Sequence, residues 1–191
     1  MLKDLLVSKV RVKLLHLFFS NPTELYHVRG LVRKTQEEIN AVRRELQNLE
    51  KVGLLKKEPR GNRLYYWLNT GYCLYQELMQ AVAKETGLGQ EITKNKNRLG
   101  KVNFCVFSGR FVRRMSREED EVDILVVGNI VMVELAALVK VEEEKRGQEI
   151  NYTVMTNDEF EFRKKRRDPF LLGILSSSRV MIIGDEEELL K

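Results

Sequence analysis

The sequence has few cysteines, prolines and glycines, and it has no long apolar run. Its two cysteines, Cys73 and Cys105, lie far apart and provide neither a disulfide framework nor the spacing of a zinc site, so both thiols are expected to be reduced and buried. With 3 Pro and 12 Gly among 191 residues, collagen-like and low-complexity classes are excluded. The apolar runs stop well short of the roughly 20 residues that cross a membrane, and no secretory signal follows Met1. We therefore expect a cytoplasmic protein without a membrane partner.

Charge is unevenly distributed along the chain. Residues 1–70 contain 14 Lys and Arg against 7 Asp and Glu, whereas residues 101–191 contain 15 against 18. Hydrophobic residues make up 43% of the chain, which is enough for a packed core, and the length allows one medium domain or two small ones. The basic first third predicts contact with a polyanion. The alternative is a solvated surface of Lys and Arg side chains that has no partner.

The first third contains a series of helix signals. Apolar residues recur with helical spacing from Leu5 onward, and Asn21-Pro22 ends this first helix. An extended stretch at 24–28 and a short helix at 29–34 follow.

A third helix and a hairpin complete this part of the chain. Thr35 followed by Glu38 forms a capping box that opens the helix, and Gly53 stands just past its end as a C-cap. Two extended runs, 54–58 and 63–68, flank a four-residue connection and predict a hairpin. The apolar stripe of the helix contains Ile39, Val42, Leu46, Leu49 and Val52.

The polar side of the third helix and the hairpin carry residue types that suit DNA. Asn and Gln can bond adenine bidentately, Arg can bond guanine, and Lys can neutralise phosphate. A short helix and a tight turn precede the helix, which is the geometry in which one helix braces another against a duplex. An ordinary solvated helix face is the alternative. The candidate DNA-binding residues are Gln36, Glu37, Asn40, Arg43, Arg44, Gln47, Lys51, Lys56, Lys57, Arg60, Asn62 and Arg63.

Residues 24–69, ELYHVRGLVRKTQEEINAVRRELQNLEKVGLLKKEPRGNRLYYWLN, resemble prokaryotic winged-helix transcription regulators of the ArsR/MarR type. The resemblance covers about the first 70 residues. It implies a winged helix-turn-helix fold, double-stranded DNA as the partner, and regulation of transcription. Because two-fold operators match two-fold proteins, we expect a homodimer, and the apolar face of a helix at 72–82 is a candidate interface.

Beyond residue 90, predicted strands and helices alternate, which is typical of a small α/β domain. Thr156 with Glu159, and Asp168 with Pro169, each predict the start of a helix. The whole chain is therefore expected to be α+β. Its parts are a winged helix-turn-helix at 1–70, a linking helix with a Gly-containing linker at 71–90, and an α/β domain at 91–191.

The segments KVNFCVFSGRFVRR and EEDEVDILVVG resemble the nucleotidyltransferase fold of the DNA polymerase beta superfamily, in its minimal form. That family has Gly-Ser at the start of a helix and two acidic residues, one apart, on the next strand. The resemblance implies nucleotide contacts at Gly109, Arg110 and Arg113. It also implies Mg²⁺ ligands at Glu121 and Asp123, because paired carboxylates hold the metal ions that bridge the nucleotide and the attacking oxygen.

The match departs from the family in ways that bear on catalysis. Glu121 stands where the family has Asp, Arg110 stands where it has Ser, and the predicted strand at 149–156 offers no third acid except Glu149 at its edge. We therefore expect an inactive nucleotidyltransferase-like domain that serves dimerisation or nucleotide sensing. The alternative is a Mg²⁺-dependent nucleotidyltransferase that transfers adenylyl groups from a nucleoside triphosphate to a protein or RNA partner, as in toxin–antitoxin pairs. A third interpretation is that Glu121 and Asp123 simply end an exposed acidic run at 118–120.

Overall fold

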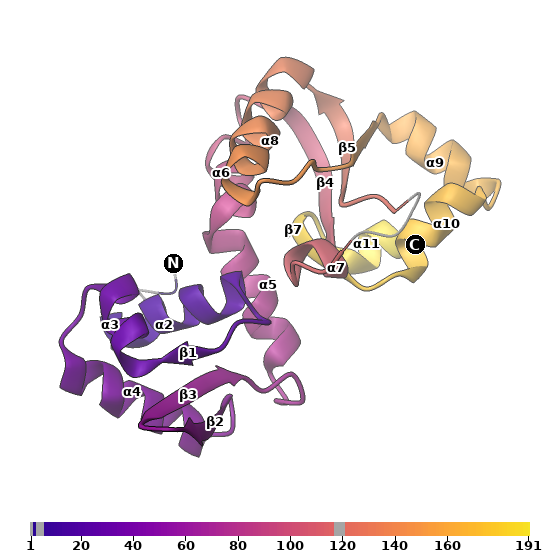
Figure 1. Cartoon of the computed structure of the whole chain (residues 1–191). Helices are drawn as coiled ribbons and strands as arrows, with labels where there is room; N and C mark the ends of the chain where they lie inside the picture. The colour runs from indigo at the N-terminus through magenta and orange to yellow at the C-terminus, as the bar shows by residue number, and fades with distance from the viewer. Residues whose placement is uncertain (1, 3–5, 117–120) are drawn as a thin grey trace. The chain divides into compact units, whose positions relative to one another are not determined.

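The computed structural model describes residue 2 and residues 6–116 and 121–191, and it divides the chain into two compact units, 1–85 and 86–191. Figure 1 shows that each unit combines helices with one sheet, so the chain is α+β, as expected. The region 71–90, expected to link two domains, is shared between the units. No helix among the described residues is long and apolar enough to cross a membrane.

In the described part of unit 1, helices α2, α3 and α4 precede a hairpin, and α5 follows it. The sheet has the order β1-β3-β2 with antiparallel neighbours. The three leading helices contact one another and bury Leu14, Phe18, Leu31, Val42 and Leu46. The elements are α2 (Lys9–Ser20), β1 (Tyr26–His27), α3 (Val28–Thr35), α4 (Ile39–Lys51), β2 (Leu55–Arg60), β3 (Arg63–Leu68) and α5 (Tyr75–Glu85).

The junction of α3 and α4 differs from the predicted capping box. Thr35 is the last residue of α3, and its hydroxyl donates to a carbonyl oxygen one turn earlier at 2.8 Å. Gln36 follows in the left-handed conformation with a φ of 55°. Glu38 is itself the N-cap of α4, because its carboxylate accepts the backbone N–H groups of Asn40 and Ala41 at 2.8 Å each. The capping-box prediction was wrong because Thr35 ends the preceding helix, so that Glu38 rather than Thr35 caps the N–H groups at the start of α4.

The hairpin is tighter than predicted. Arg60 pairs with Arg63 across the strands, so that Gly61 and Asn62 alone form the turn. Gly61 has a φ of +59°, and glycine at the first position is typical of two-residue turns that match the strand twist. The predicted four-residue connection was too long because Pro59 lies in β2, an edge strand, where a missing N–H is tolerated.

The apolar face of α5 is buried within unit 1. Tyr75, Met79 and Val82 are buried, and α5 packs against α2. The rings of Phe19 and Tyr75 have their centroids 5.6 Å apart. The prediction of a dimer interface on the helix at 72–82 was therefore wrong, because the core of the same unit covers that face.

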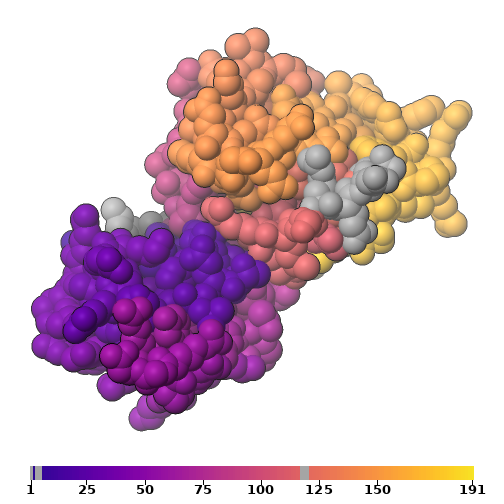
Figure 2. All heavy atoms as spheres, viewed as in Figure 1, coloured from indigo at the N-terminus to yellow at the C-terminus, as the bar shows by residue number. Residues whose placement is uncertain are grey.

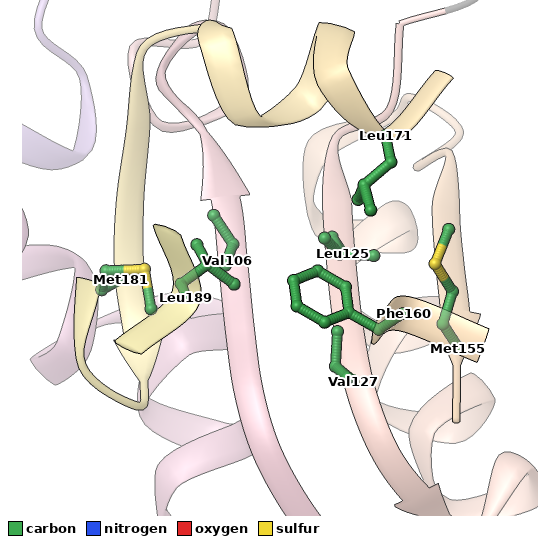
Figure 3. Packing of buried hydrophobic residues seen from close by; sticks show 8 residues of the cluster. All are labelled: Val106, Leu125, Val127, Met155, Phe160, Leu171, Met181 and Leu189. Carbon is green, nitrogen blue, oxygen red and sulfur yellow. The ribbon is translucent and has the colours of Figure 1, made fainter. Parts of the chain in front are cut away.

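Unit 2 contains a four-stranded sheet with the order β6-β5-β4-β7. β4 runs antiparallel to β5 and β7, and β5 runs parallel to β6. Figure 3 shows the apolar cluster on one face of this sheet, where Phe160 of α9, Leu171 of α10 and Leu189 of α11 meet strand residues such as Leu125. Figure 1 shows α6 and α8 on the other side of the sheet. The elements are α6 (Gly87–Lys94), β4 (Gly100–Ser108), α7 (Gly109–Val112), β5 (Ile124–Ile130), α8 (Met132–Arg146), β6 (Tyr152–Met155), α9 (Asn157–Lys165), α10 (Pro169–Ser176), β7 (Arg179–Ile183) and α11 (Glu186–Leu190).

Two local predictions in unit 2 are confirmed and one prediction about the cysteines is half wrong. Thr156 caps α9 and Asp168 caps α10 through their side chains. Cys105 is buried, as expected, whereas Cys73 is exposed. Cys73 lies in the loop before α5, where no sheet or helix face covers the thiol.

Candidate nucleic-acid interface

The outer side of α4 presents the residues that were expected to face DNA. The opposite side of the helix buries Val42, Leu46 and Leu49 of the apolar stripe. Ile39 at its start is half-buried, and Val52 is exposed because α4 ends at Lys51. Polar and cationic side chains therefore project from this helix without a covering element. The exposed candidates on α4 are Asn40, Arg43, Arg44, Gln47 and Lys51.

Glu45 links α4 to α2 through an ion pair, and sequence reasoning missed it. The Glu45 side chain is only 7% exposed, and its Oε2 lies 2.8 Å from Nε of Arg11 on α2, which is 38% exposed. A buried carboxylate needs such a partner to offset the loss of its hydration. Glu45 stands three residues after Val42, on the apolar side of the helix, and this spacing could have identified it as a buried acid.

Lys13 neutralises one acid beside the junction of α3 and α4. Its Nζ lies 2.6 Å from the carboxylate of Glu37 and donates to the carbonyl oxygen of Thr35 at 2.8 Å. The hydrogen bond from Lys13 holds the pKa of Glu37 below its ordinary value. The backbone N–H groups of Asn40 and Ala41 likewise lower the pKa of Glu38. Glu37, named as a candidate DNA contact, is therefore engaged within its own unit.

A basic concavity of about 450 Å³ lies between the start of α3, the middle of α4 and the hairpin. Arg29, Arg43 and Arg63 bring three guanidinium groups to it from three different elements. The fork of a guanidinium group matches the oxygens of a phosphate, so the concavity suits a nucleic-acid backbone. It is lined by His27, Val28, Arg29, Arg43, Gln47, Asn62, Arg63, Leu64 and Tyr66.

His27 and Arg29 are among the lining residues that sequence reasoning did not name as candidate contacts. Nδ1 of His27 accepts the backbone N–H of Gly30 at 3.2 Å, so the neutral ring carries its proton on Nε2. The pairing of β1 with β3, which sets His27 opposite Tyr65, brings this segment next to the hairpin. No local pattern encodes that pairing, and only the fold reveals that both residues line the concavity.

The hairpin cations divide into paired and unpaired groups. Nζ of Lys57 lies 3.0 Å from the carboxylate of Glu50, and Arg60 pairs with Glu58. Figure 2 shows the hairpin, coloured purple to magenta, at the surface of unit 1. Among the residues that the structure describes, the cations of this surface that take part in no ion pair are Arg29, Arg43, Arg44, Lys51, Lys56 and Arg63. Three of these cations, Arg29, Arg43 and Arg63, line the concavity.

In unit 2, the residues of the nucleotidyltransferase resemblance have partners within the protein. The backbone N–H of Gly109 donates to the carbonyl oxygen of Ser178 at 2.7 Å, and a Cβ at Gly109 would lie 2.2 Å from the Ser178 hydroxyl oxygen. Nη2 of Arg113 donates to the same hydroxyl at 3.2 Å. A phosphate could reach this N–H group only by displacing Ser178.

The two acidic candidates face different spaces. Nε of Arg110 lies 3.2 Å from Oε2 of Glu121, whereas buried Asp123 accepts the backbone N–H of Asn151 at 2.9 Å. Glu121 lines a cavity of about 490 Å³, while Asp123 lines a hollow of about 50 Å³. Because ligand pockets usually measure roughly 300–1,000 Å³, the hollow at Asp123 is too small for a nucleotide.

The third acid does not complete a metal site. Glu149 lines the small hollow together with Asp123 and Arg146. Across residues 6–116 and 121–191, no group of three or more His, Cys, Asp or Glu side chains is placed to hold a metal ion. The acidic run at 118–120 and Leu5 of the first predicted helix lie outside the described residues.

Comparisons with protein-family models, curated proteins and solved structures gave no significant match for this chain. The chemistry of the surfaces is therefore the basis for assigning a function. Unit 1 offers unpaired cations and exposed polar side chains on one surface, which can hold a polyanion. The candidate nucleotide site of unit 2 is occupied by the protein's own groups.

Proposed function

We propose that the chain is a DNA-binding transcription regulator, and that unit 1 is a winged helix-turn-helix of the ArsR/MarR type acting in the cytoplasm. The observation that carries the proposal is the set of unpaired cations around the concavity between α3, α4 and the hairpin. The order of three helices followed by a hairpin supports it. Such a surface attracts a phosphate backbone and provides most of the non-specific affinity for DNA.

In this proposal α4 enters the major groove. Asn40, Arg44 and Gln47 reach base edges, since they are exposed on the side of α4 that faces away from the core. The arginines of the concavity hold backbone phosphates beside the groove, and the hairpin tip at Gly61 and Asn62 lies along the duplex. The ion pair between Arg11 and Glu45 helps to keep the side of α4 that carries Asn40, Arg44 and Gln47 facing outward.

A gel-shift series with the full chain tests the proposal. The probes are a duplex from upstream of its own coding sequence and a random duplex of equal length. Both duplexes should be retarded at about 50 mM salt. As the salt concentration increases, the complex with the random duplex should be lost first. Absence of retardation at about 50 mM salt would remove the proposal, because phosphate contacts dominate there.

For unit 2 we propose a nucleotidyltransferase-like scaffold that does not turn over. The order of strand, short helix and strand, with Gly109 opening α7, supports the likeness. The contacts of Gly109 with Ser178 and of Glu121 with Arg110 count against catalysis. Incubation with labelled ATP, Mg²⁺ and candidate protein or RNA partners should give no transfer. Transfer that disappears in Asp123→Asn would establish the enzyme alternative instead.

We also propose a homodimer, with the outer side of α8 as the surface that fits it. Val133 is 80% exposed and Val141 is 47% exposed on this helix. If two copies of α8 lie antiparallel about Ala137, Val133 of one copy faces Val141 of the other. Glu134, whose carboxylate also lies 3.0 Å from Nη2 of Arg98 in its own chain, then faces Lys140, so apolar and oppositely charged groups meet. Sedimentation equilibrium should give a dimer that Val133→Lys dissociates; a wild-type monomer at all concentrations would refute the proposal.

A further inference from the structure

A second large cavity, of about 490 Å³, lies in unit 2 where α10 packs against the sheet. Its volume falls in the range of small-molecule sites. Its walls come from β4, β5, α10 and the turn that precedes β7. It is lined by Val106, Ser108, Glu121, Val122, Leu125, Pro169, Phe170, Gly173, Ile174, Ser177, Ser178 and Arg179.

Most of the wall is apolar. Val106 and Leu125 are buried strand residues, and Ile174 of α10 is half-buried against the same core. Phe170, which also lines the cavity, leaves 41% of its surface exposed. A large aromatic side chain that stays exposed beside an apolar cavity gains from a ligand that covers it.

The charged groups of the wall are already paired. Glu121 lies 3.2 Å from Arg110, and Arg179 lies 2.8 Å from Glu186. An ionic ligand would have to compete with these partners after losing its own hydration. The wall therefore favours a neutral ligand.

Two hydroxyl groups can bind a ligand acceptor. The Ser108 hydroxyl oxygen accepts the N–H of Phe111 at 3.1 Å, and that of Ser178 accepts from Arg113 at 3.2 Å. In the part of the chain that the structure describes, neither hydroxyl donates to a protein acceptor. Each O–H proton can therefore be donated to an oxygen of a bound molecule.

We propose that this cavity binds a small neutral molecule with an apolar body and one hydrogen-bond acceptor, such as a carbonyl oxygen. The apolar body lies against Val106, Leu125 and Ile174, and the acceptor faces the hydroxyls of Ser108 and Ser178. This site goes beyond the proposed DNA binding, since every residue that forms it belongs to unit 2. Its test needs no DNA, so its failure is distinguishable from failure of the regulator proposal.

The experiment uses the full chain with labelled methyl groups and two probes of equal skeleton. 1-Tetralone has an apolar bicyclic body with a carbonyl oxygen, and tetralin is the same body without it. Titration with 1-tetralone should shift the NMR methyl signals of Val106, Leu125 and Ile174. 1-Tetralone should also bind about fivefold more tightly than tetralin, which is the factor that one neutral hydrogen bond supplies. Shifts confined to other methyl groups, or equal affinity for the two probes, would overturn the proposal.

Variants at two positions of the wall sharpen the test. A Cβ at Gly173 meets no atom within 4 Å, so a side chain can start there without a clash at its first atom. Gly173→Phe is chosen to fill the cavity, and Gly173→Ala is its matched control. Gly173→Phe should abolish the binding of both probes, whereas Gly173→Ala should retain it. Ser178→Ala should reduce the preference for 1-tetralone over tetralin. Unchanged binding in Gly173→Phe, or an unchanged preference in Ser178→Ala, would count against the assigned cavity.

Discussion

The three arginines that line the basic concavity provide the most direct test of the DNA interface. Arg29, Arg43 and Arg63 have no ion pair among the described residues, so each is available for one phosphate. Each phosphate contact adds about −0.9 to the slope of log K against log salt, so three contacts account for an affinity loss of about 40-fold between roughly 50 and 200 mM salt. Each change to Ala is expected to reduce the slope by about 1, and the triple change by about 3.

Fluorescence anisotropy of a labelled duplex, measured over a range of salt concentrations, gives these slopes directly. Lys57→Ala and Lys96→Ala remove the same unit of charge and serve as matched controls. Lys57 is already paired with Glu50, and Lys96 is exposed in unit 2, so both should change the slope by less than half as much as Arg43→Ala. If Lys96→Ala flattens the slope as much as Arg43→Ala does, overall charge rather than the concavity drives binding and the reasoning is refuted.

Three further predictions follow from unit 1. Arg44→Ala should relax sequence preference at one base pair by about 1–3 kcal/mol, as measured by competition with single-base operator variants. A uniform weakening of binding to all sequences would contradict a base contact. Glu45→Ala removes the buried partner of Arg11 and should lower the free energy of unfolding, measured in urea, by about 1–3 kcal/mol. Glu45→Gln keeps an acceptor and should cause a smaller loss. Equal losses in the two variants would show that the hydrogen bond is unimportant. The N–H groups of Asn40 and Ala41 hold the pKa of Glu38 below its ordinary value of 4.5, so its capping contribution is complete above that pH and is lost as the pH falls through the lowered pKa. NMR titration of the Glu38 carboxyl should show this lowered pKa, and a midpoint at or above 4.5 would disprove the cap.

The sequence predicted the outer side of α4 because helical periodicity is a local property. A stripe built on Val42 and Leu46 leaves the opposite side to water, and Asn40 and Arg44 are exposed there. The same logic could have identified Glu45, since a polar residue at an apolar position of the stripe indicates a buried pair. Its partner, Arg11, lies 34 residues earlier, and no local pattern connects the two.

The basic concavity could be predicted only in part for a similar reason. Arg43 and Arg63 were named from the helix and the hairpin, whose residue types suit phosphate. Arg29 joins them because β1 pairs with β3, setting Tyr26 opposite Tyr66. Likewise, the sequence shows every cation but not which ones are neutralised, and Lys57 is paired with Glu50 across the gap between α4 and β2. Residue types therefore predicted the kind of surface, while tertiary pairing decided which side chains are available.

The same distinction bears on what unit 2 can bind. A glycine at a helix start offers an N–H group to phosphate, but at Gly109 this group is bonded to Ser178, which lies 69 residues later in the chain. Binding a phosphate at this N–H group would break that bond, and this loss opposes binding. The turn at Ser178 that closes the phosphate site also lines the cavity under α10. Because one segment both blocks the anion and bounds an apolar space, an apolar, neutral ligand is expected for unit 2 rather than a nucleotide.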